Sequence, residues 1–173
     1  VGERIWLKRR FKEYKIADQD LGKLKMRMDI IPVSLALAQA ANESGWGTSR
    51  FALEGNALFG QWTWSKKGIS PKNKDPNKSH RILQFQVLKA SVRAYKNNLN
   101  THNAYAEFRE ARARLRQEDK KITGLDLTKY LENYSAIGEK YVAIIENIIK
   151  INSLTDFDKA NLLPTKLKTG IAL

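Results

Sequence analysis

Hydrophobic side chains recur at helical spacing over most of this chain of 173 residues. In residues 3–15 they alternate with charged side chains, which predicts a basic amphipathic helix. A second helix should begin near Asp18 or Asp20, because either side chain could cap its first turn. We therefore expect residues 1–30 to form a helical extension that packs on the main domain.

An alanine-rich apolar segment predicts the third helix. Pro32 suits its first turn, where a missing N–H costs nothing, and Gly45 suits a left-handed stop at its end. Thr48 is expected to cap a short helix that ends near Gly55. Residues 56–60 should then form a tight turn.

The pattern changes after this turn. Residues 61–65 are aromatic and β-prone, and residues 81–87 alternate apolar with polar side chains. Between them, residues 66–80 are rich in Lys, Asn and Pro, as is typical of a loop. We predict two short strands around a long basic loop, which together form a β-lobe over residues 61–87.

Helical patterns return over residues 88–100, 104–118, 126–133 and 137–152. The last of these carries an apolar stripe made of Tyr141, Ile144, Ile145, Ile148 and Ile149. Residues 153–173 have little helical signal and are expected to form a tail. The fold class is therefore α+β and mostly helical, with a small β-hairpin lobe beside a cleft in a main domain over residues 31–152.

The composition excludes several kinds of site. Cysteine is absent, which excludes disulfides, thiolate metal sites and Cys nucleophiles. Only His80 and His102 are present, without the spacing of a zinc motif, and there is no GxSxG segment. We expect no metal and no cofactor.

The charge balance points to a polyanionic partner. With 31 Lys and Arg against 18 Asp and Glu, the net charge is +13. This excess suits nucleic acid, an acidic membrane surface or an anionic cell-wall polymer, or it serves solubility alone. No apolar run approaches the roughly 20 residues of a membrane span. The chain begins at Val1 without a visible signal peptide, so we interpret it as processed.

Glu43 is the candidate for acid catalysis. Leu35, Gln39 and Glu43 share one face of the predicted helix, beside small alanines, so this face should point inward. Burial and the negative end of the helix dipole would both raise the pKa of a carboxyl there. A carboxyl that stays protonated near neutral pH can serve as a general acid in glycoside cleavage. The alternative is a solvated Glu43, or one paired with Arg50.

Aromatic residues surround this acid in the sequence. Gly45 and Gly47 would let the backbone turn sharply and bring Trp46 beside Glu43. Trp62 and Trp64 alternate with Thr63, so both would lie on one face of the predicted strand. Such rings could stack on sugars, or they could belong to the core.

Two motifs resemble a known family. Residues 41–47, Ala-Asn-Glu-Ser-Gly-Trp-Gly, and residues 54–60, Glu-Gly-Asn-Ala-Leu-Phe-Gly, are similar to the signature of bacterial endo-β-N-acetylglucosaminidases. These peptidoglycan hydrolases include the glucosaminidase domain of the flagellar protein FlgJ. The segments 61–64, 98–105 and 134–142 resemble more narrowly the Bax-type branch.

The resemblance implies a lysozyme-like fold in which Glu43 is the general acid facing a glycan groove. It implies hydrolysis of the β-1,4 bond after N-acetylglucosamine in peptidoglycan. It places Tyr105 near the reaction centre, unless that side chain is a core aromatic. The expected substrate-binding residues are Trp46, Asn56, Phe59, Gln61, Trp62 and Trp64. We expect a monomer in the periplasm or cell envelope, with peptidoglycan as its partner.

The sequence departs from the family at the second acid. Residues 78–88 contain no carboxylate, and the nearest candidate is Asp75 in the basic loop. The substrate's own acetamido group could replace a second acid, or the enzyme could be a lytic transglycosylase with one Glu. A non-catalytic binder of glycan or nucleic acid is the other alternative. Basic residues are spread along the chain and no nucleic-acid module is recognisable, so no nucleic-acid partner is expected.

Overall fold

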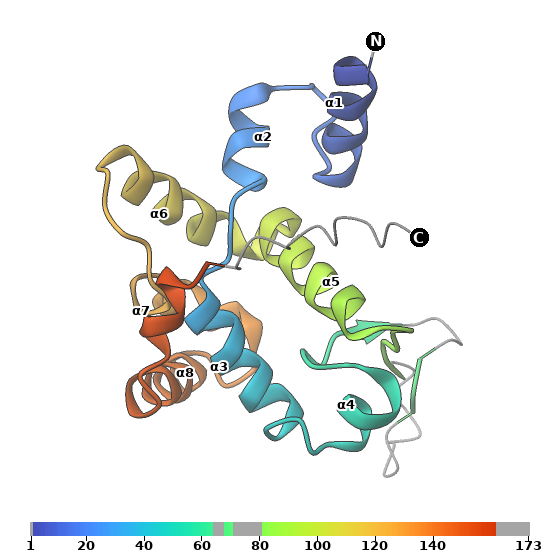
Figure 1. Cartoon of the computed structure of the whole chain (residues 1–173), viewed down its shortest axis with the longest axis vertical. Helices are drawn as coiled ribbons and strands as arrows, with labels where there is room; N and C mark the ends of the chain where they lie inside the picture. Colours follow the sequence, from blue (N-terminus) through green and yellow to red (C-terminus); the bar gives the residue numbers. More distant parts are fainter. Residues whose placement is uncertain (1, 64–67, 71–80, 162–173) are drawn as a thin grey trace, which may run out of the picture.

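A computed structural model of the chain describes residues 2–63, 68–70 and 81–161. The described chain is mostly helical with one pair of short antiparallel strands, which confirms the predicted α+β class (Figure 1). Helices α1 (Gly2–Glu13) and α2 (Leu21–Arg27) lie together at one end of the molecule. The helices that carry the candidate acid and its surroundings lie toward the other end.

The two N-terminal helices form where the pattern predicts them. Asp20, rather than Asp18, caps α2, because its carboxylate accepts a hydrogen bond from the backbone N–H of Lys23 at 2.7 Å. This part of the chain has its own small apolar cluster, which consists of Phe11, Tyr14, Ile16 and Leu24.

A buried arginine joins this end to the rest of the molecule. The guanidinium of Arg112, on α6 (Ala106–Gln117), donates to the carbonyls of Met26 and Ile30 at 2.8 and 2.5 Å. It also donates to Oδ1 of Asn100 at 2.8 Å and lies 3.6 Å from the carboxylate of Asp29. Since the side chain is fully buried, these partners replace the water that the charge has lost.

The main core lies among α3 (Val33–Ser44), α5 (Leu88–Thr101), α6 and α8 (Glu139–Ile151). The predicted stripe on α8 is confirmed in its centre, where Tyr141, Ile145 and Ile149 are buried, whereas Ile144 is exposed. On α3, Leu35 and Gln39 are fully buried, so the face that leads to Glu43 points inward as expected.

The ends of α3 and α4 (Arg50–Gly55) differ slightly from prediction. Gly45 ends α3 in the left-handed conformation, as predicted, but Pro32 lies just outside the first turn. Ser49, not Thr48, caps α4 through its hydroxyl, which accepts from the N–H of Ala52. The Thr48 hydroxyl instead donates to the carbonyl of Gly45 at 2.6 Å.

The hairpin is shorter than predicted. Strands β1 (Trp62–Thr63) and β2 (Arg81–Ile82) are antiparallel, with Trp62 opposite Ile82, and Ile69 adds an isolated bridge to Ile82. Residues 83–87 form no strand, although their side chains alternate in polarity. The N–H groups of Leu83 and Phe85 donate to the carbonyls of Gln61 and Gly55, both at 2.8 Å, and these single hydrogen bonds to two different places do not make a ladder.

Three 3₁₀ helices were not predicted as such. The expected helix over 126–133 is a short α7 (Gly124–Leu127) followed by η2 (Thr128–Tyr134), which kinks at Leu131. The segment η1 (Asn103–Tyr105) precedes α6. Runs this short are held by tertiary contacts and carry little periodicity of their own.

The third, η3 (Leu154–Lys159), lies in the segment that we predicted as a tail with little helix. Asp158 anchors it, because the carboxylate accepts hydrogen bonds from the N–H and hydroxyl of Ser34 at 2.8 and 2.6 Å. It also accepts from the N–H of Gly124 at 3.2 Å. Residues 154–159 are therefore helical where little helix was expected, because long-range hydrogen bonds hold a segment whose local signal is weak.

None of the described helices has the length and apolar character needed to cross a membrane. Among the same residues, no group of three or more His, Asp or Glu side chains is arranged to hold a metal ion. The expected division into residues 1–30, 31–152 and 153–173 stays a prediction.

Candidate active site

Glu43 lies in the last turn of α3 and is half-buried. Burial raises the pKa of this carboxyl above its usual value, and hydrogen bonds from Tyr141 and Asn42 partly oppose the rise. The Nδ2 atom of Asn42 lies 3.3 Å from Oε1. Arg50 forms its ion pair with Glu54 at 3.4 Å, so the predicted alternative of a Glu43–Arg50 pair is wrong.

A glycine brings the backbone up against this carboxyl. Gly60 has a φ of +57°, and a Cβ atom added there would lie 3.2 Å from Oε2 of Glu43. The turn after α4 therefore covers one side of Glu43, and only a residue without a side chain leaves the carboxyl its room.

Three tyrosines from three elements face Glu43. The phenol of Tyr141 on α8 lowers the pKa of the carboxyl, and Glu43 in turn raises the pKa of the phenols of Tyr105 on η1 and Tyr134 on η2. The rings of Tyr134 and Tyr141 are stacked with centroids 5.5 Å apart, and those of Tyr105 and Tyr134 are 6.1 Å apart. Burial raises the pKa of all three phenols, so they are neutral at ordinary pH.

Sequence reasoning identified Tyr105 but not Tyr134 or Tyr141. Tyr105 is buried, is hydrogen-bonded to Asn98, and lies in η1 rather than inside a longer helix. Tyr141 was counted only as part of an apolar stripe. The sequence did carry a signal for Tyr141, because it is the one residue of this stripe with a hydroxyl group. A buried Tyr hydroxyl needs a polar partner, which an apolar stripe does not supply.

A second polar layer lies behind Glu43. The amide of Gln39, one turn earlier on α3, donates from Nε2 to the hydroxyl of Tyr141 at 2.9 Å. The hydroxyl of Tyr95 on α5 donates to Oε1 of Gln39 at 2.6 Å. Gln39, Tyr95 and Tyr141 are each at most 1% exposed, so these hydrogen bonds are shielded from water.

Two of the expected aromatic contacts are exposed. Trp46 is 64% exposed and Trp62 is 61% exposed. Trp46 has a φ of +57°, a left-handed conformation that costs a residue with a side chain roughly 1–2 kcal/mol. The backbone N–H of Trp46 donates to the carbonyl of Ala41 at 2.8 Å, which holds this turn directly after Glu43.

The other expected contacts have structural partners. The ring of Phe59 is 4% exposed and stacks on Tyr95 with centroids 3.9 Å apart, so it belongs to the core. Asn56 is the left-handed cap of α4, and its Nδ2 donates to the carbonyl of Phe85 at 3.0 Å. The Oε1 atom of Gln61 is buried and has no hydrogen-bond partner among the described residues.

Trp64 and Asp75 lie outside the described residues. Among the residues described, no second carboxylate interacts with Glu43. The arrangement can therefore hold a proton on one carboxyl and stabilise the carboxylate that remains once the proton has left.

Two cavities of the described surface lie away from Glu43. One of about 720 Å³ lies between α2 and α6, and one of about 300 Å³ is lined by residues of η1, α6 and η2. Neither is lined by Glu43. We place the candidate site at Glu43 because a partly buried acid with a specific phenol partner is a stronger sign of chemistry than a hollow in the surface.

Comparisons with known proteins agree with the motifs. The glucosaminidase family model, described as mannosyl-glycoprotein endo-beta-N-acetylglucosaminidase, matches residues 19–154. Protein bax of Escherichia coli (strain K12) is 43% identical over 115 residues, which are 66% of this chain and 40% of that protein. The chain thus spans well under half of this relative. No solved structure matches the chain.

Proposed function

Because the chain belongs to the glucosaminidase family, we propose that it is a peptidoglycan hydrolase that cleaves the β-1,4 bond after N-acetylglucosamine. Glu43 acts as the general acid and gives its proton to the glycosidic oxygen as the bond breaks. The observation that carries this proposal is the half-buried carboxyl at the end of α3, whose pKa is raised by burial and on which the buried phenol of Tyr141 acts in the opposite direction.

Two opposing effects on Glu43 suit this role. Burial favours the protonated form, which is the form needed before bond cleavage. The hydrogen bond from Tyr141 favours the carboxylate, which is the form left afterwards. Tyr105 and Tyr134 bring hydroxyl groups to the same place, where they can orient the substrate's acetamido group or face the oxocarbenium-like transition state.

Trp46 and Trp62 supply the glycan-binding surface. Their indole rings are large, exposed and close in sequence to Glu43 and to the turn at Gly60. Strained residues are retained where the surrounding structure and function require them, and Trp46 is such a residue. Stacking of sugar rings on these indoles would hold the chain of sugars across the acid.

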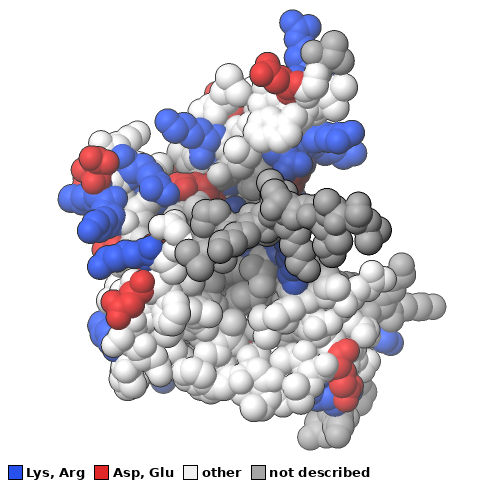
Figure 2. Space-filling model, in the orientation of Figure 1, with Lys and Arg blue, Asp and Glu red and all other residues white. Residues whose placement is uncertain are grey.

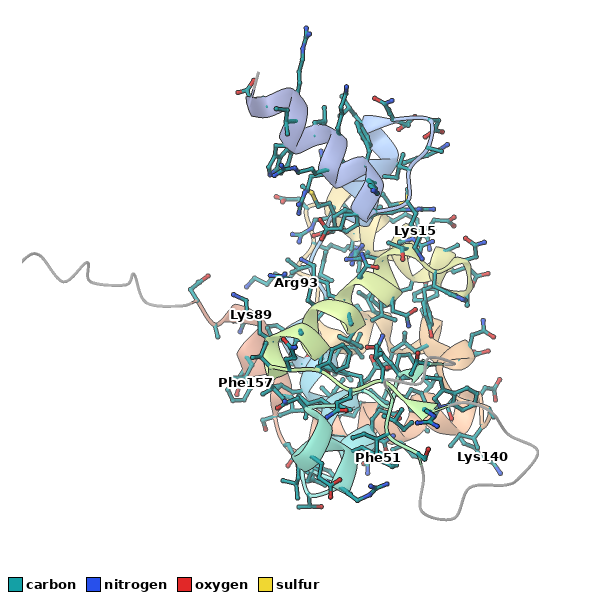
Figure 3. The ribbon with its side chains drawn as sticks, turned by 90° about the vertical axis from the view of Figure 1, so that its right-hand side faces the viewer. Lys15, Phe51, Lys89, Arg93, Lys140 and Phe157 are labelled. Carbon is teal, nitrogen blue, oxygen red and sulfur yellow. The ribbon has the colours of Figure 1, made fainter. Side chains whose placement is uncertain are left out.

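The basic surface would hold the enzyme on the anionic wall polymer. Figure 2 shows Lys and Arg grouped over one end and one side of the molecule, where the N-terminal helices and α6 lie in Figure 1. On α5, Lys89 and Arg93 are one turn apart, and both are exposed (Figure 3). Adsorption through these charges should weaken as salt rises. This role implies a periplasmic or envelope location.

The test is digestion of purified sacculi by the wild type and by Glu43→Gln, with Glu54→Gln as the matched control because Glu54 is an exposed acid on the next helix. We expect no clearing by Glu43→Gln and normal clearing by Glu54→Gln. Equal clearing by all three proteins would overturn the proposal and favour a non-catalytic glycan binder. Parallel digests of a chitooligosaccharide and a mannosyl glycoprotein decide which N-acetylglucosamine linkage is cleaved.

One observation favours a second candidate, a lytic transglycosylase of similar fold. No second carboxylate among the described residues interacts with Glu43, and a transglycosylase can work with one Glu. Mass spectrometry of the fragments separates the two, because an anhydro product is lighter by one water, about 18 Da. If Asp75 supplies the second carboxylate, Asp75→Asn should abolish hydrolysis.

A further inference from the structure

The side chains behind Glu43 form a row of hydrogen bonds that all donate in one direction. The hydroxyl of Tyr95 donates to Gln39 at 2.6 Å, and the amide of Gln39 donates at 2.9 Å to the hydroxyl of Tyr141, which lowers the pKa of the neighbouring Glu43 carboxyl. We propose that Gln39 and Tyr95 are positioning residues, which force the Tyr141 hydroxyl to donate its proton toward Glu43. This inference rests on the proposed role of Glu43 as the acid.

The direction of the row depends on the orientation of one amide. If the terminal amide of Gln39 were rotated by 180°, its oxygen would face Tyr141. That oxygen would then accept the only hydroxyl proton of Tyr141. Tyr141 would then have no proton to donate to Glu43.

Tyr95 selects between these two orientations. In the observed orientation its hydroxyl donates to Gln39 at 2.6 Å. In the turned orientation the Gln39 amide would donate to Tyr95, and the Tyr95 proton would need another acceptor. The side chain is only 1% exposed, so water cannot supply that acceptor. Because a buried donor without an acceptor is costly, the observed orientation is strongly preferred.

The orientation matters for the position of the acid proton. The Glu43 oxygen that accepts from Tyr141 is already engaged, so the proton of the neutral acid is carried by the other oxygen. That proton remains available for the substrate, and the Tyr141 hydrogen bond persists when Glu43 becomes a carboxylate. Among the described residues, the groups that act on Glu43 are Asn42 and the phenols of Tyr105, Tyr134 and Tyr141, with no charged side chain among them.

The experiment is an NMR titration of the Glu43 carboxyl in the whole chain, with ¹³C-labelled glutamate, and Glu43→Gln assigns the signal. Tyr141→Phe removes the donor itself and should move the pKa of Glu43 upward. Tyr95→Phe and Gln39→Met should move it in the same direction by a smaller amount, because they leave the donor in place but free its orientation. The double variant Tyr95→Phe/Tyr141→Phe should titrate like Tyr141→Phe alone, since Tyr95 acts only through Tyr141.

One control separates positioning from loss of any buried phenol. Tyr14→Phe removes the hydroxyl of a buried ring in the separate N-terminal cluster, and it should leave the titration of Glu43 unchanged. On a chitooligosaccharide, Tyr95→Phe should lower kcat several-fold with little change in KM, and the alkaline limb of its pH profile should shift upward.

The inference is overturned if Tyr95→Phe and Gln39→Met titrate like the wild type, or if the double variant shifts Glu43 by the sum of the single shifts. The titration needs no catalytic activity, so it gives its result even if Glu43→Gln leaves clearing intact and the proposed function fails. Thermal unfolding of each variant identifies any that does not fold. If either Tyr95→Phe or Gln39→Met fails to fold, the other one carries the test.

Discussion

The close approach of Gly60 to Glu43 makes a sharp prediction for Gly60→Ala. At a φ of +57° an alanine costs roughly 1–2 kcal/mol of folding free energy, which should leave the protein folded. The new Cβ would lie 3.2 Å from Oε2 of Glu43, so the carboxyl has to give way by a few tenths of an ångström. A misplacement of about 1 Å can cost 10²-fold in rate, so this displacement should lower kcat roughly 3- to 10-fold.

The matched control is Gly138→Ala. Gly138 has a φ of +54°, and an added Cβ there would meet no atom within 4 Å. It should lose stability in a urea titration to a similar or greater extent and keep its turnover of chitooligosaccharide. If the two variants lose the same fraction of kcat, the loss reflects backbone strain, and the reasoning that places Gly60 against the acid is refuted.

Three further predictions concern stability. Arg112→Met should lower the free energy of unfolding by roughly 3–5 kcal/mol in urea, because it leaves the carbonyls of Met26 and Ile30 and the Oδ1 atom of Asn100 without their donor. The exposed Arg116→Met should cost under about 1 kcal/mol. Asp158→Asn should cost roughly 1–3 kcal/mol by the same measurement, because two of its three donors are backbone N–H groups, and an unchanged midpoint would contradict the anchoring of η3. Because burial raises the pKa of Glu43, this residue favours folding below its ordinary pKa of 4.5, and that contribution is lost as pH rises through the raised value. Glu43→Gln should therefore gain thermal stability relative to the wild type between pH 4 and pH 8, and a constant difference would contradict the raised pKa.

Local spacing was enough to predict the helix that carries the candidate acid. The apolar face through Leu35 and Gln39, followed by Gly45, predicts a helix that ends just after Glu43, and the structure has that helix. Helical periodicity and a left-handed stop depend on neighbours within one or two turns, so they are readable in sequence. The two motifs around Glu43 and Gly60 likewise identified the family that the comparisons confirm.

What surrounds the acid was decided by tertiary structure. Gln39 bonds to Tyr95 and Tyr141, which are 56 and 102 positions away in the chain, and Tyr141 had been assigned to an apolar stripe. Asp158 holds Ser34 across 124 positions. Periodicity predicts which side of a helix is buried, but the polar partner that a buried group meets depends on how distant elements pack. The sequence alone could therefore name Glu43, whereas only the folded chain determines its protonation and the direction of the hydrogen bond it receives.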